Sequence, residues 1–169
     1  MENYNFTQLG YEDFLQYYLL VEKTLQETTD SKAASGAGSD TWHDEGFKIG
    51  IGDEMMWSQN FGKLQVILKN SKVVIPKEQD KKILLGNGVF IETDGQETFF
   101  FIDGYLMKSG KNRISINSPL GQSLLNKKVG DEFVIKFGSN PRKILVKKII
   151  LPSEAIKIIL DEKKEGASK

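Results

Sequence analysis

Residues 114–132 read ISINSPLGQSLLNKKVGDE and contain, in succession, the signals of a strand, a short helix and a turn. The β-branched start favours a strand. Ser118 can cap a helix and Pro119 suits its first position, after which Leu120, Leu124 and Leu125 form one apolar face. Gly and Asp at 130–131 are typical of a turn. This order of elements predicts an α+β unit.

Short apolar or β-branched runs on both sides of this stretch predict more strands, at residues 89–91, 98–102, 133–135 and 144–146. Turn residues separate the runs, as at 94–95 and 138–141. We therefore expect residues 77–152 to form an antiparallel β-sheet domain with one short helix. Residues 153–169 form an extension: Ser153 is expected to cap an amphipathic segment over 155–160, and the charged tail beyond it is expected to be disordered.

The first 75 residues contain no proline and show helical periodicity. One apolar seam, at alternating spacings of three and four, predicts a helix over 9–33; its members are Tyr11, Phe14, Tyr18, Val21 and Leu25. A second seam predicts a helix from Asp44 to about Ser71; its members are Phe47, Gly50, Glu54, Trp57, Phe61, Leu64, Leu68 and Ser71. Two long helices with a short connection predict that residues 1–76 form an antiparallel coiled-coil hairpin with its tip at about 36–46.

Composition limits the possible functions of these two units. A chain of 169 residues with a formal net charge of +0 is neither a large multidomain enzyme nor a uniformly basic nucleic-acid binder. The charge is uneven, since residues 1–76 carry 11 acidic and 6 basic side chains. With no cysteine and one histidine, a disulfide framework or a multi-histidine metal site is excluded. No run approaches the roughly 18 apolar residues of a membrane span, so we expect a cytoplasmic protein without a membrane partner.

The densest polar feature is SDTWHDE at residues 39–45, where the hairpin turns. Asp40, Asp44 and Glu45 supply carboxylates there, and Mg²⁺ is commonly held by one or two carboxylates with its other ligands supplied from elsewhere. Aspartate at a helix start also caps free N–H groups, so both interpretations stay open. Trp42 either packs back on the hairpin or meets a partner, and His43 either takes part in metal or proton chemistry or simply forms hydrogen bonds.

The C-terminal unit offers two further surfaces. Its aromatic residues could form a stacking platform for single-stranded nucleic acid, but a sheet core explains them better; they are Phe99, Phe100, Phe101, Tyr105 and Phe133. Its basic residues form either a solvated face or a docking face for an acidic protein; they are Lys127, Lys128, Lys136, Arg142, Lys143, Lys147 and Lys148. No phosphate loop, nucleophile elbow or zinc signature is present, so we expect no self-contained active site.

Residues 114–132 resemble the C-terminal signature of the Gre family of bacterial transcript cleavage factors, in which a strand, a Ser-Pro-capped helix and a Lys-x-Gly-Asp turn follow one another. Residues 64–74, with KNSKVV running into a proline, resemble the end of the second coiled-coil helix of that family, and Leu9-Gly10-Tyr11 resembles the start of the first. The resemblance covers about 140 residues.

The resemblance implies that the C-terminal domain has an FK506-binding-protein-like (FKBP-like) fold and docks on RNA polymerase. The hairpin then enters the secondary channel, where tip acids help to hold a Mg²⁺ ion shared with the polymerase, and the polymerase cleaves backtracked RNA. The factor has no cofactor of its own and is not itself an enzyme. Its expected partners are RNA polymerase and the nascent RNA 3′ end in the elongation complex, and we expect a monomer.

The family tip has an Asp and a Glu three positions apart, and here Thr41 stands at the Asp position and Asp44 at the Glu position. The candidate catalytic residues are therefore Asp44, Asp40 and Glu45, with Asp44 and Asp40 as metal ligands. The resemblance implies partner contacts for Trp42, His43, Ser118, Pro119, Leu120, Gly121, Lys127, Lys128, Gly130 and Asp131. Two other functions stay open: a channel regulator that does not stimulate cleavage, and a peptidyl-prolyl isomerase acting through the C-terminal domain.

Overall fold

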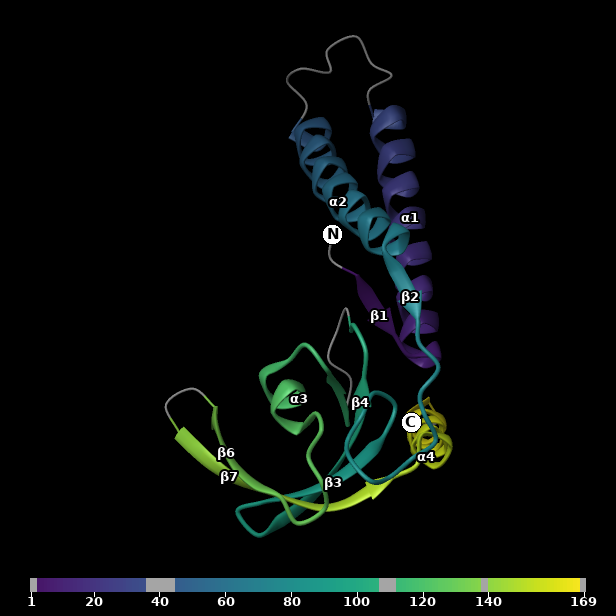
Figure 1. Cartoon of the computed structure of the whole chain (residues 1–169). Coiled ribbons are helices and arrows are strands. Elements are labelled where there is room, and N and C mark those ends of the chain that lie inside the picture. The colour runs from purple at the N-terminus through teal and green to yellow at the C-terminus, as the bar shows by residue number, and fades with distance from the viewer. Residues whose placement is uncertain (1–2, 36–44, 107–111, 138–139, 168–169) are drawn as a thin grey trace. The chain divides into compact units, whose positions relative to one another are not determined.

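The computed structural model describes residues 3–35, 45–106, 112–137 and 140–167 (Figure 1). Contacts divide the chain into unit 1, residues 1–4 and 12–71, and unit 2, residues 5–11 and 72–169. The segment Asn5–Tyr11 packs with the C-terminal strands, and the C-terminal extension belongs to the same unit as the sheet.

Unit 1 is a helical hairpin, as predicted, made by α1 (Gln8–Ser35) and α2 (Glu45–Lys69). The seam residues Phe14, Val21 and Leu64 are buried between the helices. The rings of Tyr18 and Phe61 lie 5.0 Å apart, with a tilt of 40° between their planes. These contacts lie along the predicted seams, because residues spaced by three and four share one face of a helix.

Two short strands, β1 (Tyr4–Phe6) and β2 (Ser71–Val73), pair as a separate two-stranded sheet. The Val74 N–H donates to the Phe6 carbonyl at 2.8 Å, and the Tyr4 N–H donates to the Asn70 carbonyl at 3.1 Å. Both strands lie within residues 1–76, the range predicted to form the hairpin. Three residues are too few to show an alternating pattern, so their pairing depends on where the chain returns after α2.

The main sheet belongs to unit 2 and has the strand order β5-β4-β3-β7-β6. Its strands are β3 (Gly88–Thr93), β4 (Gln96–Asp103), β5 (Arg113–Ser115), β6 (Glu132–Phe137) and β7 (Asn140–Ile150). The expected antiparallel sheet is correct for three of its four pairings. The exception is β5, which runs parallel to β4 with Phe101 opposite Arg113. A parallel neighbour is possible because the chain passes through residues 104–112 before β5 begins.

The sheet has a separate apolar core on each face. Val89, Ile91 and Ile102 point to one face, where Leu124 of α3 (Pro119–Leu124) packs on them. Phe99, Phe101 and Ile150 point to the other face, where Ala155 and Ile159 of α4 (Pro152–Ala167) cover them. Alternation of side chains along each strand produces the two cores. Figure 1 shows α3 on the concave side of the curled sheet.

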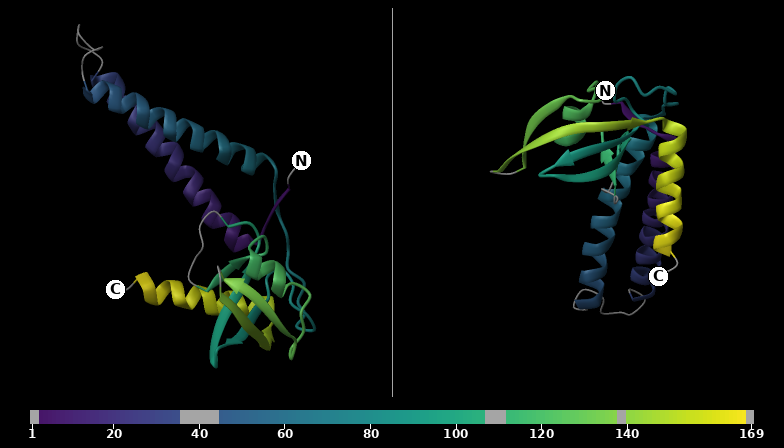
Figure 2. Two further views of the ribbon diagram at one scale, coloured as in Figure 1. Left: turned by 90° about the vertical axis from the view of Figure 1, so that its left-hand side faces the viewer. Right: turned by 90° about the horizontal axis from the view of Figure 1, so that it is seen from below.

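Helix α4 corrects the expectation of a disordered tail. It begins at Pro152 and continues to Ala167, and Figure 2 shows it as one helix. Ser153 is not its cap: its N–H donates to Glu78 Oε1 at 3.0 Å from within the first turn. Asn112 Nδ2 donates to Glu162 Oε1 at 2.8 Å, far along the helix. None of the helices in the described ranges is long and apolar enough to span a bilayer.

We predict that Ile159→Ala lowers the free energy of unfolding by about 2–4 kcal/mol, because it leaves a cavity against the rings of Phe99 and Phe101. The adjacent Leu160 is 40% exposed, so Leu160→Ala is the matched control and should cost less than about 1 kcal/mol. Urea denaturation followed by circular dichroism measures both. Equal losses in the two variants would contradict burial of the sheet by α4.

Candidate functional site

The predicted Ser-Pro cap of α3 is present. Ser118 Oγ accepts a hydrogen bond from the Gly121 N–H at 3.0 Å, and it donates to the Ser115 carbonyl at 2.7 Å. Only glycine fits at position 121, since a Cβ there would lie 2.0 Å from the Ser115 carbonyl oxygen. Pro119 is exposed, and Leu120 is half-buried. Ser118 and Gly121 therefore build the helix start, and Pro119 and Leu120 remain accessible at the surface.

The turn after α3 is held to the sheet by its backbone. Gly130 has a φ of 90°, and its N–H donates to the Val146 carbonyl at 2.8 Å. Asp131 Oδ2 accepts from the Lys128 N–H at 2.9 Å, which closes the turn. Lys127 lies 5.3 Å from the centre of the Phe133 ring, whereas the Lys128 side chain is exposed. Gly130 and Asp131 thus have local structural roles, and Lys128 is available to a partner.

A hollow of about 210 Å³ lies beside the first turn of α3. Its apolar lining comes from Ile91, Phe100, Leu120 and Ile144. Its polar lining comes from Thr93, Asp94, Gln96, Thr98 and Arg142. Arg142 Nε lies 3.9 Å from Asp94 Oδ2. An apolar floor with a polar edge suits an apolar side chain presented by another protein.

The predicted basic face is partly neutralised by ion pairs between strands. Lys143 Nζ lies 2.6 Å from Glu132 Oε2, and Lys147 Nζ lies 3.0 Å from Glu92 Oε2. The hydrogen bond to Glu92, and then its negative charge, raise the pKa of Lys147 above its ordinary value. Within the described ranges no ion pair is found for Lys128, Lys136 or Lys148. The charges of these three lysines are therefore not neutralised by a neighbouring carboxylate in the part of the chain that the structure describes.

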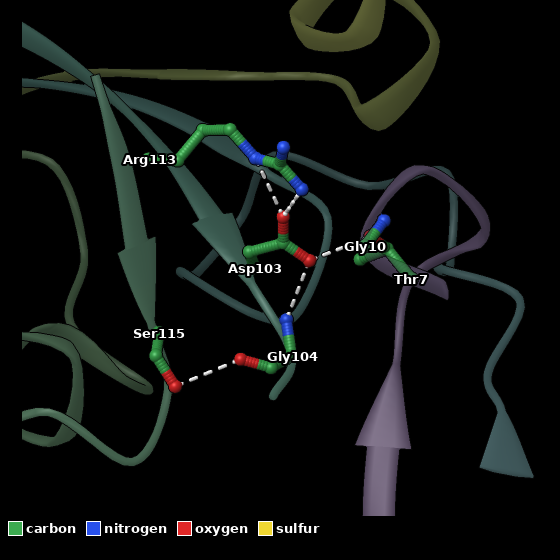
Figure 3. Close-up of polar contacts among 6 residues, drawn as sticks. All are labelled: Thr7, Gly10, Asp103, Gly104, Arg113 and Ser115. Carbon is green, nitrogen blue, oxygen red and sulfur yellow. Dashed lines mark hydrogen bonds and ion pairs between the residues drawn. The ribbon is translucent and has the colours of Figure 1, made fainter. Parts of the chain in front are cut away.

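Unit 2 contains a fully buried carboxylate, that of Asp103 at the end of β4 (Figure 3). Its Oδ2 accepts two hydrogen bonds from Arg113, one of them from Nε at 2.8 Å and the other from Nη2. Its Oδ1 accepts from the Thr7 hydroxyl at 2.6 Å and from the Gly104 N–H at 2.8 Å. Four donors thus satisfy a charge that water does not reach, and we call this arrangement the Asp103 cluster: Thr7, Gly10, Asp103, Gly104 and Arg113.

The local sequence pattern does not indicate the Asp103 cluster. Asp103 follows the apolar run at 98–102 and is easily assigned to the turn beyond it. One signal was available: the chain has only two arginines, Arg113 and Arg142, and arginine is the residue best suited to a buried ion pair. Which carboxylate pairs with Arg113 depends on the parallel register of β4 and β5, which sequence alone did not indicate.

The aromatic residues belong to the core of the sheet, the interpretation that the sequence favoured over a stacking platform. Phe101 is fully buried and Phe99 is 9% exposed, so neither ring can stack on a base. Phe100 and Phe133 are partly buried against the other core. Within the described residues, no group of three or more His, Asp or Glu side chains is placed to hold a metal ion.

The tip residues Asp40, Trp42, His43 and Asp44 lie outside the described residues. Glu45 is the first residue of α2, and its backbone is helical. The structure therefore describes the two helices that carry the tip, whereas the metal and catalytic assignments at the tip remain predictions.

These elements define a class of protein in which a curled five-stranded sheet with one capped helix is joined to a helical hairpin. Residues 77–150 match the family described as "Transcription elongation factor, GreA/GreB, C-term". Residues 77–150 are therefore similar to the C-terminal domain of GreA/GreB transcription elongation factors.

Individual relatives agree with this family. Transcription elongation factor GreB of Pseudomonas putida is 45% identical over 71 residues, which cover 40% of this chain and 44% of that protein. Transcription elongation factor GreA of Thermotoga sp. strain RQ2 is 30% identical over 87 residues, which cover 50% and 56%. The chain thus spans about half the length of the curated relatives it matches. A solved structure, the GreA factor homolog Gfh1 of Thermus thermophilus, is 22% identical with a TM-score of 0.42, covering 88% of this chain and 99% of that one.

We predict that Asp103→Ala lowers the free energy of unfolding by about 3–5 kcal/mol, because the Arg113 guanidinium is then buried without its counter-charge. The control is Glu132→Ala, which removes the exposed partner of Lys143 and should cost about 0.2–1 kcal/mol. Thermal and urea unfolding measure the two losses. A loss at Asp103 no larger than that at Glu132 would contradict the burial of the pair.

Proposed function

We propose that this protein is a transcription elongation factor that binds RNA polymerase, inserts its hairpin tip into the secondary channel and stimulates cleavage of backtracked RNA. The observation that carries the proposal is the family match over residues 77–150, on a chain whose N-terminal half forms a two-helix hairpin. The protein then acts in the cytoplasm as a monomer, and the polymerase performs the hydrolysis.

Docking is assigned to unit 2, at the surface formed by the first turn of α3 and the hollow beside it. The exposed Pro119 and half-buried Leu120 lie at this surface, and the hollow beside them is lined in part by Ile91, Phe100 and Ile144. Exposed Lys128, in the turn after α3, adds positive charge suited to an acidic partner surface. Ser118, Gly121, Gly130 and Asp131 support docking by fixing the backbone around these side chains.

The tip supplies carboxylates. Asp44 and Asp40, with Glu45 beside them, are the candidate ligands, and carboxylate oxygens are the donors that Mg²⁺ prefers. Mg²⁺ shared with the polymerase would stabilise the charge that develops on the reacting phosphate. Trp42 and His43 are then placed to contact the polymerase or the RNA 3′ end.

We predict that Asp44→Ala lowers the maximal rate of RNA cleavage in backtracked elongation complexes by at least about tenfold, because a metal ligand is lost. The concentration needed for half-maximal effect should stay unchanged, since docking is left intact. Gel analysis of labelled RNA in the cognate polymerase complex measures both quantities. The matched control is Asp53→Ala, at an exposed position of α2, which should behave as wild type.

We also predict that Leu120→Ala raises roughly tenfold the concentration of the protein needed for half-maximal RNA cleavage. The maximal cleavage rate should stay unchanged, because the change removes only apolar contact at the docking surface. Val134→Ala is the control, since Val134 is 65% exposed and lies on the opposite face of the sheet from α3. Titration of each variant into backtracked complexes measures the shift. Equal shifts for Leu120 and Val134 would place docking elsewhere.

A second function is favoured by one feature of the tip. Thr41 stands where the family has an aspartate, so one of the two family carboxylates is missing from its usual position. A factor with a weakened metal site could occupy the channel and slow nucleotide entry without stimulating cleavage. In that case wild type and Asp44→Ala slow elongation equally, and neither releases short RNA fragments.

A further inference from the structure

The hollow beside α3 lies within unit 2, since every residue that lines it belongs to that unit. Its apolar residues lie on the face of the sheet on which α3 packs. Ile91 and Ile144 are buried, whereas Phe100 and Leu120 are half-buried. Because these four side chains are apolar, the inner part of the hollow suits an apolar side chain of a bound molecule.

The charged edge of the hollow is formed by the turn between β3 and β4 and by β7. Asp94 and Gly95 have φ angles of 54° and 77°, as in a tight two-residue hairpin turn. Ile144 lies opposite Thr93, so Arg142, two residues along β7 on the same face, lies level with this turn. The fold therefore places one cation and one anion together at the same end of the hollow.

The guanidinium of Arg142 is accessible to a ligand. Its Nε lies 3.9 Å from Asp94 Oδ2, beyond hydrogen-bond distance, and the two side chains are 53% and 69% exposed. A guanidinium carries five N–H donors in a planar fork, and that fork matches the two oxygens of a carboxylate. A carboxylate joined to the apolar group in the hollow is therefore the ligand that this edge suits.

The sign of the ligand's charge has to be argued, because Asp94 stands beside Arg142. Residues 77–169 carry 17 basic and 12 acidic side chains, so their field attracts anions. A guanidinium also binds a carboxylate through two parallel hydrogen bonds, which makes a stronger contact than a single ion pair. Both considerations favour a carboxylate at Arg142 over a cation at Asp94.

We propose that Arg142 is a specificity-determining residue of this hollow, which binds a large apolar side chain together with a neighbouring carboxylate of a partner protein. That the partner is RNA polymerase rests on the function proposed above. The apolar group supplies buried contact, and the carboxylate distinguishes this partner from other apolar surfaces. Asp94 competes with the partner's carboxylate for the same guanidinium and so weakens binding.

The first test uses the full-length chain and two probes, N-acetyl-L-leucine and N-acetyl-L-leucinamide, of which the first carries a carboxylate and the second a neutral amide. Titration followed by the NMR shifts of the Thr98 and Leu120 amides measures both dissociation constants. We expect wild type to bind the acid roughly threefold more tightly or better, and Arg142→Ala to bind both probes equally.

Lys143→Ala is the matched control for this titration and should keep the preference of wild type. Lys143 is the next residue of β7, points to the opposite face and pairs with Glu132. Failure of both probes to bind, equal binding of the two by wild type, or a preference that persists in Arg142→Ala would overturn the proposal. Tighter binding of the cationic probe L-leucinamide would assign recognition to Asp94 and would also overturn it.

The second test is titration into backtracked complexes of the cognate polymerase. Arg142→Ala should raise the half-maximal concentration for cleavage or slowed elongation roughly threefold or more, and Lys143→Ala should leave it within about twofold of wild type. Asp94→Asn should lower it roughly twofold, because it removes the competing carboxylate while asparagine tolerates the left-handed φ. An unchanged value in Asp94→Asn would overturn the competition.

The two proposals can fail separately. If the wild-type chain has no effect on the polymerase, the proposed function fails, and the probe titrations still decide whether the hollow recognises a carboxylate. If wild type acts on the polymerase and Arg142→Ala behaves as Lys143→Ala does, the proposed function stands and the role of Arg142 in binding this partner is overturned.

Discussion

The buried carboxylate of Asp103 joins three separate parts of unit 2. It receives hydrogen bonds from Arg113 on β5, from the backbone that follows β4, and from Thr7 at the start of α1. A carboxylate without these donors would be costly to bury in this position, since its desolvation would be uncompensated. The parallel β4–β5 pair, the close approach at Gly104 and the docking of Asn5–Tyr11 are therefore parts of one arrangement.

Two helices complete the sheet in different ways. Helix α3 has six residues and depends on its Ser-Pro start, and it leaves a hollow beside Leu120 on the concave face. Helix α4 lies beyond the family match, which ends at residue 150, and it closes the opposite face over Phe99 and Phe101. One face is thus available for a partner, whereas the part of the other face over these two rings is occupied by the chain itself. This asymmetry supports the proposal that a partner docks on the α3 side.

Strong local signals made much of the fold predictable. Seams at spacings of three and four indicated the hairpin, because helical neighbours share a face; β-branched runs indicated the five strands of the main sheet, and Ser118 and Pro119 indicated α3. Weak or absent local signals account for the errors. The three-residue strands β1 and β2 have no pattern of their own, and α4 extends into a charged stretch because its apolar side packs on the sheet.

The sequence by itself determined the hairpin, the α+β unit and the resemblance to the Gre family, since each depends on residues close together in the chain. It also determined the composition of the tip, where Asp40, Asp44 and Glu45 stand with Thr41 at the usual aspartate position. Only the tertiary structure decided that Thr7 meets Asp103, 96 positions away, and that Asp103 meets Arg113 across a parallel pair of strands. The physical reason is that a buried charge takes its partners from whichever segments the fold brings together, and strand register and helix docking set that choice.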